Sequence, residues 1–180
     1  MTRDRPPHPA ALPPAELRKE LREERTRGSG PGGQHRNRVE TEVRLTHLPT
    51  GIRAFAGERR SQEQNRRMAL FRLRLNLALQ VRSPLRDEDC VPPGSHRPSD
   101  LWLGRVRNGR LRVNPEHEDF PALLAEALDV LHLYDDDLAA AAAALRISRS
   151  QLVRFLAQAP AALAALNDRR AARGQRPLRA

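Results

Sequence analysis

The 180-residue sequence has a single cysteine, Cys90, and only 3% aromatic residues. One thiol cannot form an intramolecular disulfide, and the six histidines show no ligand spacing, which excludes the common structural zinc sites. No apolar run approaches the roughly 20 residues that a membrane helix requires. The sequence therefore predicts no structural metal, no cofactor and no membrane span.

Lysine is almost absent too, because Lys19 is the only lysine among the 32 basic residues. The formal net charge of +10 and the pI of about 11.4 point to a polyanionic partner. This charge is concentrated: residues 28–82 hold eleven arginines against four glutamates, a net +7. A function that involves a polyanion is therefore expected to reside mainly in this segment.

The first 14 residues contain five prolines and have neither an apolar core nor an amphipathic helical pattern. We interpret residues 1–14 as a disordered arm rather than a signal or transit peptide. The protein is accordingly expected to stay in the cytosol.

The next segment, residues 15–82, has the pattern of a small α+β domain. A short helix from Ala15 that leads into a strand before the glycine-rich stretch is expected mainly from the family resemblance described below. Residues 43–47 and 52–55 flank a Pro/Gly turn and predict a β-hairpin. Ser61 is a suitable N-cap for a helix that runs to about Leu79.

Residues 71–79 alternate apolar and other residues, as a strand does. We nevertheless predict a helix, because no β-branched residue occurs between Ser61 and Gln80 and most residues there are good helix formers. Such a helix would carry a wide apolar surface, part of which must be covered.

Breaker residues make 83–100 a linker, and residues 101–180 form a second expected unit. In it, 101–107 and 110–113 bracket Asn108-Gly109, a strong hairpin signal, and Arg105, Arg107, Arg110 and Arg112 would make that hairpin basic. It could contact an RNA backbone or simply be solvated. Helices are expected at 122–133, 136–145, 149–158 and 160–173.

The middle two of these helices have helix-turn-helix spacing. Arg146 occupies the turn position that usually holds a glycine with a left-handed backbone. The exposed Arg149, Gln151 and Arg154 could contact nucleic acid. A small helical bundle that docks on a protein is the alternative.

The most informative stretch is Gly28-Ser29-Gly30-Pro31-Gly32-Gly33-Gln34. A glycine-rich loop alone would be weak evidence, but two further blocks follow it, residues 43–52 (VRLTHLPTGI) and residues 60–66 (RSQEQNR). These three blocks, in this order, resemble the catalytic domain of class I peptide chain release factors. The resemblance covers roughly residues 17–82 and weakens beyond residue 83.

The resemblance implies hydrolysis of peptidyl-tRNA on the ribosome, with Gly32, Gly33 and Gln34 as the catalytic residues. The backbone N–H of Gln34 would stabilise the reacting oxygen, and the two glycines would let the chain pass close to RNA. Large-subunit rRNA and peptidyl-tRNA would be the partners, and the protein would be a monomer. The candidate RNA-binding residues are Arg36, Arg38, Arg59, Arg60, Arg66, Arg67, Arg149 and Arg154.

Only about 27 residues precede the loop, and nothing resembles a codon-reading tripeptide. The chain therefore looks like a stand-alone catalytic module of the ribosome-rescue kind, acting without a stop codon. Between Asn37 and Val43, larger residues replace the small ones that the family has, which puts their contacts in doubt. Two other classes stay open: a non-catalytic rRNA- or tRNA-binding quality-control factor, and a helix-turn-helix DNA-binding regulator.

Overall fold

The computed structural model describes residues 7–26, 41–83 and 96–179. Most of the expected linker lies outside the described residues, as do Cys90 and the candidate site residues Gly32, Gly33, Gln34, Arg36 and Arg38.

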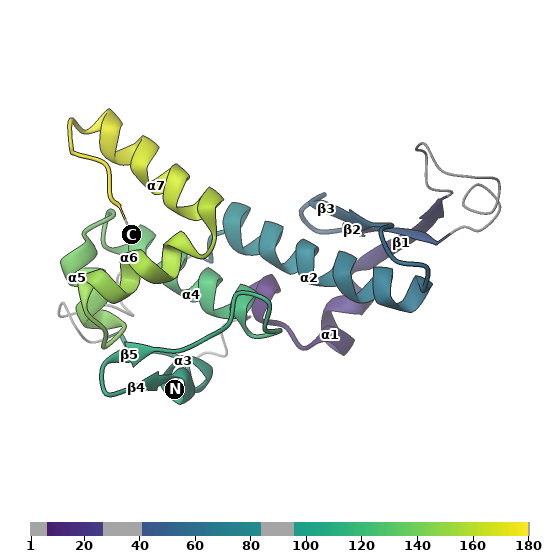
Figure 1. Ribbon diagram of the computed structural model, residues 1–180, viewed down its shortest axis with the longest axis horizontal. Coiled ribbons are helices and arrows are strands. Elements are labelled where there is room, and N and C mark those ends of the chain that lie inside the picture. The colour runs from purple at the N-terminus through teal and green to yellow at the C-terminus, as the bar shows by residue number, and fades with distance from the viewer. Residues whose placement is uncertain (1–6, 27–40, 84–95, 180) are drawn as a thin grey trace.

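The described elements mix helices with two small antiparallel sheets, which confirms the α+β prediction (Figure 1). In chain order they are η1 (Pro9–Ala11, a 3-10 helix), α1 (Pro14–Lys19), β1 (Leu21–Thr26), β2 (Glu42–His47), β3 (Arg53–Ala56), α2 (Gln62–Gln80), α3 (Asp100–Arg105), β4 (Val106–Arg107), β5 (Arg110–Leu111), α4 (Phe120–Leu133), α5 (Leu138–Ala144), α6 (Arg149–Ala157) and α7 (Pro160–Ala172).

The larger sheet has the order β1-β2-β3, and both pairings are antiparallel. Along β2, Val43 and Leu45 are buried while Arg44 between them is exposed, as expected for a sheet with one covered face. Gly51 in the β2–β3 turn has a φ of +71°, and its N–H donates to the carbonyl of His47 at 2.8 Å. The predicted hairpin is therefore confirmed.

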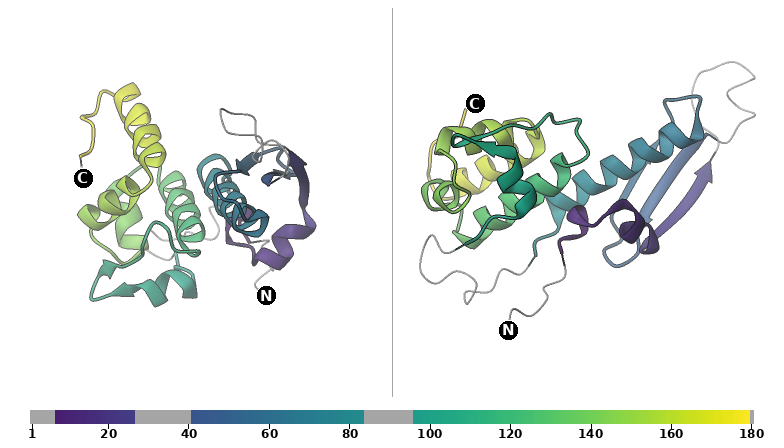
Figure 2. Two further views of the ribbon diagram at one scale, coloured as in Figure 1. Left: turned by 45° about the vertical axis from the view of Figure 1, so that its right-hand side comes forward. Right: turned by 90° about the horizontal axis from the view of Figure 1, so that it is seen from below.

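Helix α2 is confirmed as a helix despite its alternating sequence. The hydroxyl of Ser61 accepts from the N–H of Gln64, as an N-cap should. Leu73 and Leu77 are fully buried, because α2 packs against β2 and β3 on one side and against η1 and α4 on the other (Figure 2). Burial on two sides explains why apolar residues occur around so much of the helix.

The expectation of a disordered arm is wrong for residues 8–14. Ala10 is fully buried, and η1 contacts both α2 and α4. The buried Arg74 of α2 fixes this segment, because its Nε donates to the carbonyl of Ala10 at 2.9 Å and one terminal nitrogen donates to the carbonyl of Glu118 at 2.8 Å. Burial lowers the pKa of this guanidinium. One arginine thus joins the N-terminal segment to the start of α4.

A single hydrophobic core runs from the sheet through α2 into the C-terminal helices. Helix α4 lies at its centre, with nearly every residue from Phe120 to Leu131 buried. The ends of the expected linker also attach to α4: the N–H of Ser83 donates to Asp129 at 3.1 Å, and that of Ser99 donates to Glu126 at 2.7 Å. The two units expected from the sequence therefore share a core.

The prediction of a strand over residues 101–107 is wrong for its first part. Residues 100–105 form α3, because Ser99 caps this turn and the indole of Trp102 is fully buried. The remaining hairpin has two residues per strand, with φ of 51° at Asn108 and 69° at Gly109, the two positive values that a type I′ turn needs. Arg105 leaves the basic ribbon and forms an ion pair with Asp119.

The few aromatic residues concentrate in the C-terminal core. Trp102 and Phe120 each meet Phe155 edge to face, with ring centroids 5.7 and 5.4 Å apart. The indole N–H of Trp102 donates to the carbonyl of Leu145 at 2.9 Å, so no buried donor is left unsatisfied there.

The four predicted C-terminal helices are present within about two residues of their expected bounds. Helices α5 and α6 contact each other, and Arg146 between them has the left-handed φ of 56° that the sequence predicted at this turn. Their assignment as a nucleic-acid-binding helix-turn-helix stays a prediction.

Within the described ranges, no helix combines the length and the apolar character needed to cross a membrane. The same residues contain no group of three or more histidine, cysteine or carboxylate side chains placed to hold a metal ion.

Candidate functional site

The sequence block with the candidate catalytic triplet connects two adjacent strands of the larger sheet, from the end of β1 to the start of β2. Thr26, the last residue of β1, pairs with Glu42, the first residue of β2. The chain therefore leaves the sheet and re-enters it at neighbouring positions. Gly32, Gly33 and Gln34 fall between these positions in the sequence, outside the described residues. What the structure describes is the base to which this segment attaches.

Asn65 in the first turns of α2 holds that base together. Its side chain is fully buried, and its Nδ2 donates to the carbonyl of Thr41 at 2.7 Å and to that of Arg59 at 2.8 Å. Its Oδ1 accepts the N–H of Arg59 at 2.9 Å. One amide therefore ties together the residue before β2, the segment that follows β3, and α2.

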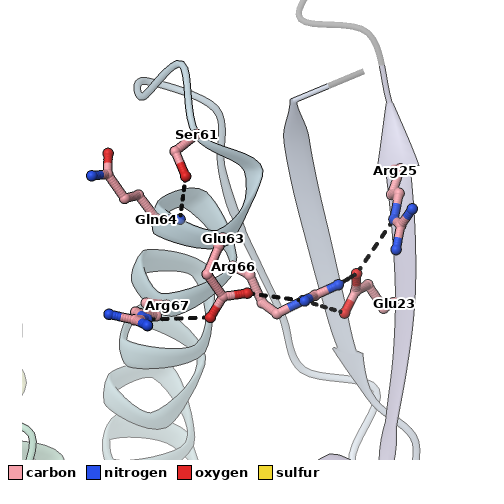
Figure 3. Close-up of polar contacts among 7 residues, drawn as sticks. All are labelled: Glu23, Arg25, Ser61, Glu63, Gln64, Arg66 and Arg67. Carbon is pink, nitrogen blue, oxygen red and sulfur yellow. Dashed lines mark hydrogen bonds and ion pairs between the residues drawn. The ribbon is translucent and has the colours of Figure 1, made fainter. Parts of the chain in front are cut away.

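A chain of charged side chains links α2 to β1 below this point (Figure 3). Arg66 donates from Nε and Nη2 to the two carboxylate oxygens of Glu23, at 3.0 and 2.7 Å. Its remaining terminal nitrogen donates to Glu63 at 3.0 Å, and Glu63 also accepts from Arg67 at 3.2 Å. The two-pronged contact fixes direction as well as distance, so it sets the angle between the strand and the helix.

The arginines lower the pKa of both glutamates. For Glu23 the main cause is the hydrogen bond from Arg66, and for Glu63 it is the hydrogen bond from Arg67. Burial works in the opposite direction in each case but is outweighed. Both carboxylates therefore stay ionised to lower pH than an isolated glutamate would.

We expect Glu23→Gln to lower the free energy of unfolding at neutral pH by about 0.5–1 kcal/mol, since the pair is partly solvated. Because the folded-state pKa lies below the ordinary 4.5, the contribution of this carboxylate is complete above 4.5 and is lost as the pH falls through the folded-state value. The wild type and the variant should therefore converge in acid. Urea unfolding across pH measures this.

Glu24→Gln is the matched control, because Glu24 is the next residue on β1 and pairs with Arg22 of the same strand at 3.2 Å instead of with α2. An equal loss in both variants would show that strand charge, rather than the link to α2, is responsible.

The candidate RNA-binding arginines of the sequence differ in what their side chains do. Arg59 and Arg60 are exposed, and their guanidinium groups have no hydrogen-bonding or ionic partner among the described residues. Arg66 is occupied by two glutamates, so its observed role is structural. Arg67 pairs with Glu63 but keeps 77% of its side chain exposed.

Arg149 and Arg154 are exposed on α6 and lie apart from this base, since the sheet and the C-terminal helices occupy opposite ends of the molecule (Figures 1 and 2). The structure thus brings together Arg59, Arg66 and Arg67 but not the two arginines of α6.

The sequence reasoning assigned no role to Asn65 or Glu23. Asparagine is a poor helix former, so its presence in the second turn of a long helix is a signal for a side-chain role. No comparable signal identified Glu23, because its partner Arg66 is 43 residues away.

Comparison with known proteins gives this region a family. The RF-1 domain family matches residues 16–89, which include β1 to β3 and α2. Peptide chain release factor 1 of Symbiobacterium thermophilum (strain DSM 24528 / JCM 14929 / IAM 14863 / T) is 51% identical over 59 residues, or 33% of this chain and 17% of that protein. Peptide chain release factor 1 of Leptothrix cholodnii (strain ATCC 51168 / LMG 8142 / SP-6) is 40% identical over 103 residues, 57% and 26% of the two chains.

Peptide chain release factor 2 of Acidovorax sp. (strain JS42) is 35% identical over 118 residues, 62% of this chain and 32% of that protein. The aligned part thus spans between about a sixth and a third of the length of these relatives. Residues 16–89 of the chain are thus similar to the RF-1 domain, and the chain shares part of its sequence with class I peptide chain release factors.

Proposed function

We propose that this protein hydrolyses the ester bond of peptidyl-tRNA on the ribosome and that it does so without reading a stop codon. The observation that carries the proposal is the RF-1 domain match over residues 16–89, a range that contains Gly32, Gly33 and Gln34. The relatives are named peptide chain release factors 1 and 2.

The reaction needs a water molecule, a donor for the developing negative charge, and little else from protein side chains. Water attacks the ester carbonyl carbon, the bond from that carbon to the tRNA ribose oxygen breaks, and the products are a peptide acid and a tRNA hydroxyl. By the family resemblance, the backbone N–H of Gln34 donates to the oxygen that gains charge, while its side chain admits water. A single such preorganised donor is worth about 10²–10³ in rate.

The architecture suits this task because side-chain contacts link the elements from which the segment departs. Asn65 joins the residue before β2, the segment after β3 and α2, and the Glu23–Arg66 pair joins β1 to α2. Elements linked in this way limit the positions that the catalytic donor can adopt. Arg59 and Arg60, which are exposed and unpaired with described residues, are candidates to contact the phosphates of large-subunit rRNA or tRNA, together with Arg36 and Arg38. Arg67 keeps enough exposure to join them.

The codon-independent part of the proposal rests on the sequence, whose 180 residues hold no segment that resembles a codon-reading tripeptide. We expect release of a labelled peptide from P-site tRNA at similar rates when the decoding site holds a stop codon, holds a sense codon or is empty of message. A release assay on purified ribosomes measures all three. A strict requirement for a stop codon would contradict codon independence, and binding without any release would favour the non-catalytic factor.

A further inference from the structure

The arginines of this protein fall into two groups. Many are neutralised by carboxylates: Arg66 by Glu23, Arg72 by Glu58, and Arg169 by Asp136. Six others, all between residues 107 and 154, are exposed and form no ion pair or side-chain hydrogen bond with any described residue. They are Arg107, Arg110, Arg112, Arg146, Arg149 and Arg154. Unpaired cations grouped in one part of a fold are a signal for an anionic partner.

Three of these side chains stand on the β4–β5 hairpin. Val106 and Leu111 are paired across it and are partly buried against the core. Since side chains alternate along a strand, Arg107, Arg110 and Arg112 are directed to the other face. They line, with Asn108, a cleft of about 450 Å³. The hairpin therefore presents an open cleft lined by three arginines and one asparagine.

The other three arginines lie on or next to α6, and β5 contacts that helix. Arg149 is the first residue of α6, and Arg154 lies near its middle. The sequences of both parts, residues 106–113 and 145–154, contain no aspartate or glutamate. Any polyanion that reached one part would thus meet no carboxylate in the other.

We propose that these two parts bind the sugar-phosphate backbone of a structured RNA at a surface separate from the RF-1 domain. This hairpin–α6 surface consists of Arg107, Arg110, Arg112, Arg146, Arg149 and Arg154. Residues two apart on a strand are separated by about 6.6 Å, which is close to the distance between neighbouring phosphates in one nucleic-acid strand. Arg110 and Arg112 can therefore each contact one of two successive phosphates.

The choice of RNA rests on the proposed function, because the surface shares one hydrophobic core with an RF-1 domain. The side chains also favour backbone contact. A protein that reads DNA bases needs several exposed side chains along a helix in the major groove. Helix α6 has only nine residues, and buried side chains take up four of them. Arginines on a hairpin and at a helix start suit phosphates instead.

Binding of the full-length protein to a 20-base-pair RNA duplex at several salt concentrations tests this. We expect wild-type affinity to fall steeply with salt. Arg110→Gln with Arg112→Gln should lower the slope of log affinity against log salt by about 2, and Arg149→Gln with Arg154→Gln by a similar amount. A DNA duplex of the same sequence should bind less tightly.

Arg22→Gln with Arg97→Gln removes the same charge from exposed positions outside the surface and should leave the slope unchanged. An unchanged slope in both test variants, an equal loss in the control, or tighter binding to DNA would overturn the proposal. Peptide release measured in parallel separates the two hypotheses. If the protein releases peptide but its RNA binding does not depend on these arginines, only the proposed RNA-binding surface is contradicted. If RNA binding depends on them but no peptide is released, only the proposed catalysis is contradicted.

Discussion

Gly33→Ala and Gln34→Gly are each expected to reduce peptide release by about 10², because each would shift the backbone N–H of residue 34 from its target, while leaving ribosome affinity nearly unchanged. In the proposed mechanism, a methyl group at position 33 would restrict the backbone where the chain passes close to RNA, and the change at position 34 would remove the side chain that admits water. Neither residue carries a charge, so the phosphate contacts that provide affinity remain. Single-turnover release at saturating protein, together with a ribosome-binding assay, separates the two effects.

Gly104→Ala is the control for adding a methyl group, because a Cβ at this position in α3 would have no atom within 4 Å. It should release peptide like the wild type. Equal losses of binding and release in the Gly33 and Gln34 variants would mean that the triplet anchors the protein. Wild-type release by both would remove the catalytic assignment.

Asn65→Ala is expected to lower the free energy of unfolding by about 2–4 kcal/mol. It should also lower the rate of peptide release per folded molecule. The substitution leaves the carbonyls of Thr41 and Arg59 and the N–H of Arg59 without their partner at a partly buried position. Because these groups fix the start of β2, the segment before it would lose its alignment. A misplacement of about 1 Å can cost on the order of 10² in rate. Urea unfolding and release per folded molecule give the two numbers.

Asn76→Ala is the matched control on the same helix. The side chain of Asn76 makes one hydrogen bond to a described residue, from its Nδ2 to the carbonyl of Arg53 at 2.9 Å, and Asn76 is only partly buried. Its replacement should lower the free energy of unfolding by less than about 1 kcal/mol and leave peptide release unchanged. If Asn65→Ala proved as mild as Asn76→Ala, the amide would not be what organises the base of the segment.

Local signals predicted much of this fold. The Ser61 cap and the absence of β-branched residues identified α2, and Asn108-Gly109 identified the small hairpin with its two positive φ values. The left-handed backbone at Arg146 was also foreseen from its place in a turn. In each case the deciding interaction lies within a few residues, so sequence alone contains it.

The errors came from long-range contacts. Proline-rich residues 8–14 look disordered in isolation and are ordered because Arg74 and α4 hold them. Residues 101–105 have the pattern of a strand but form a helix around the buried indole of Trp102. At the candidate site, the sequence identified the arginines but did not show which of them are paired with glutamates. Glu23 and Arg66, for example, are 43 positions apart.

Helix α2 has a geometric consequence for how the protein would meet a large target. It has 19 residues, which corresponds to about 28 Å at 1.5 Å per residue, and both of its ends are fastened, one to the sheet by Asn65 and Arg66 and the other to α4. A helix held at both ends fixes the distance between the elements it joins. Once the C-terminal half is bound to a target, the distance and the orientation of the sheet end are therefore determined by the number of residues in α2.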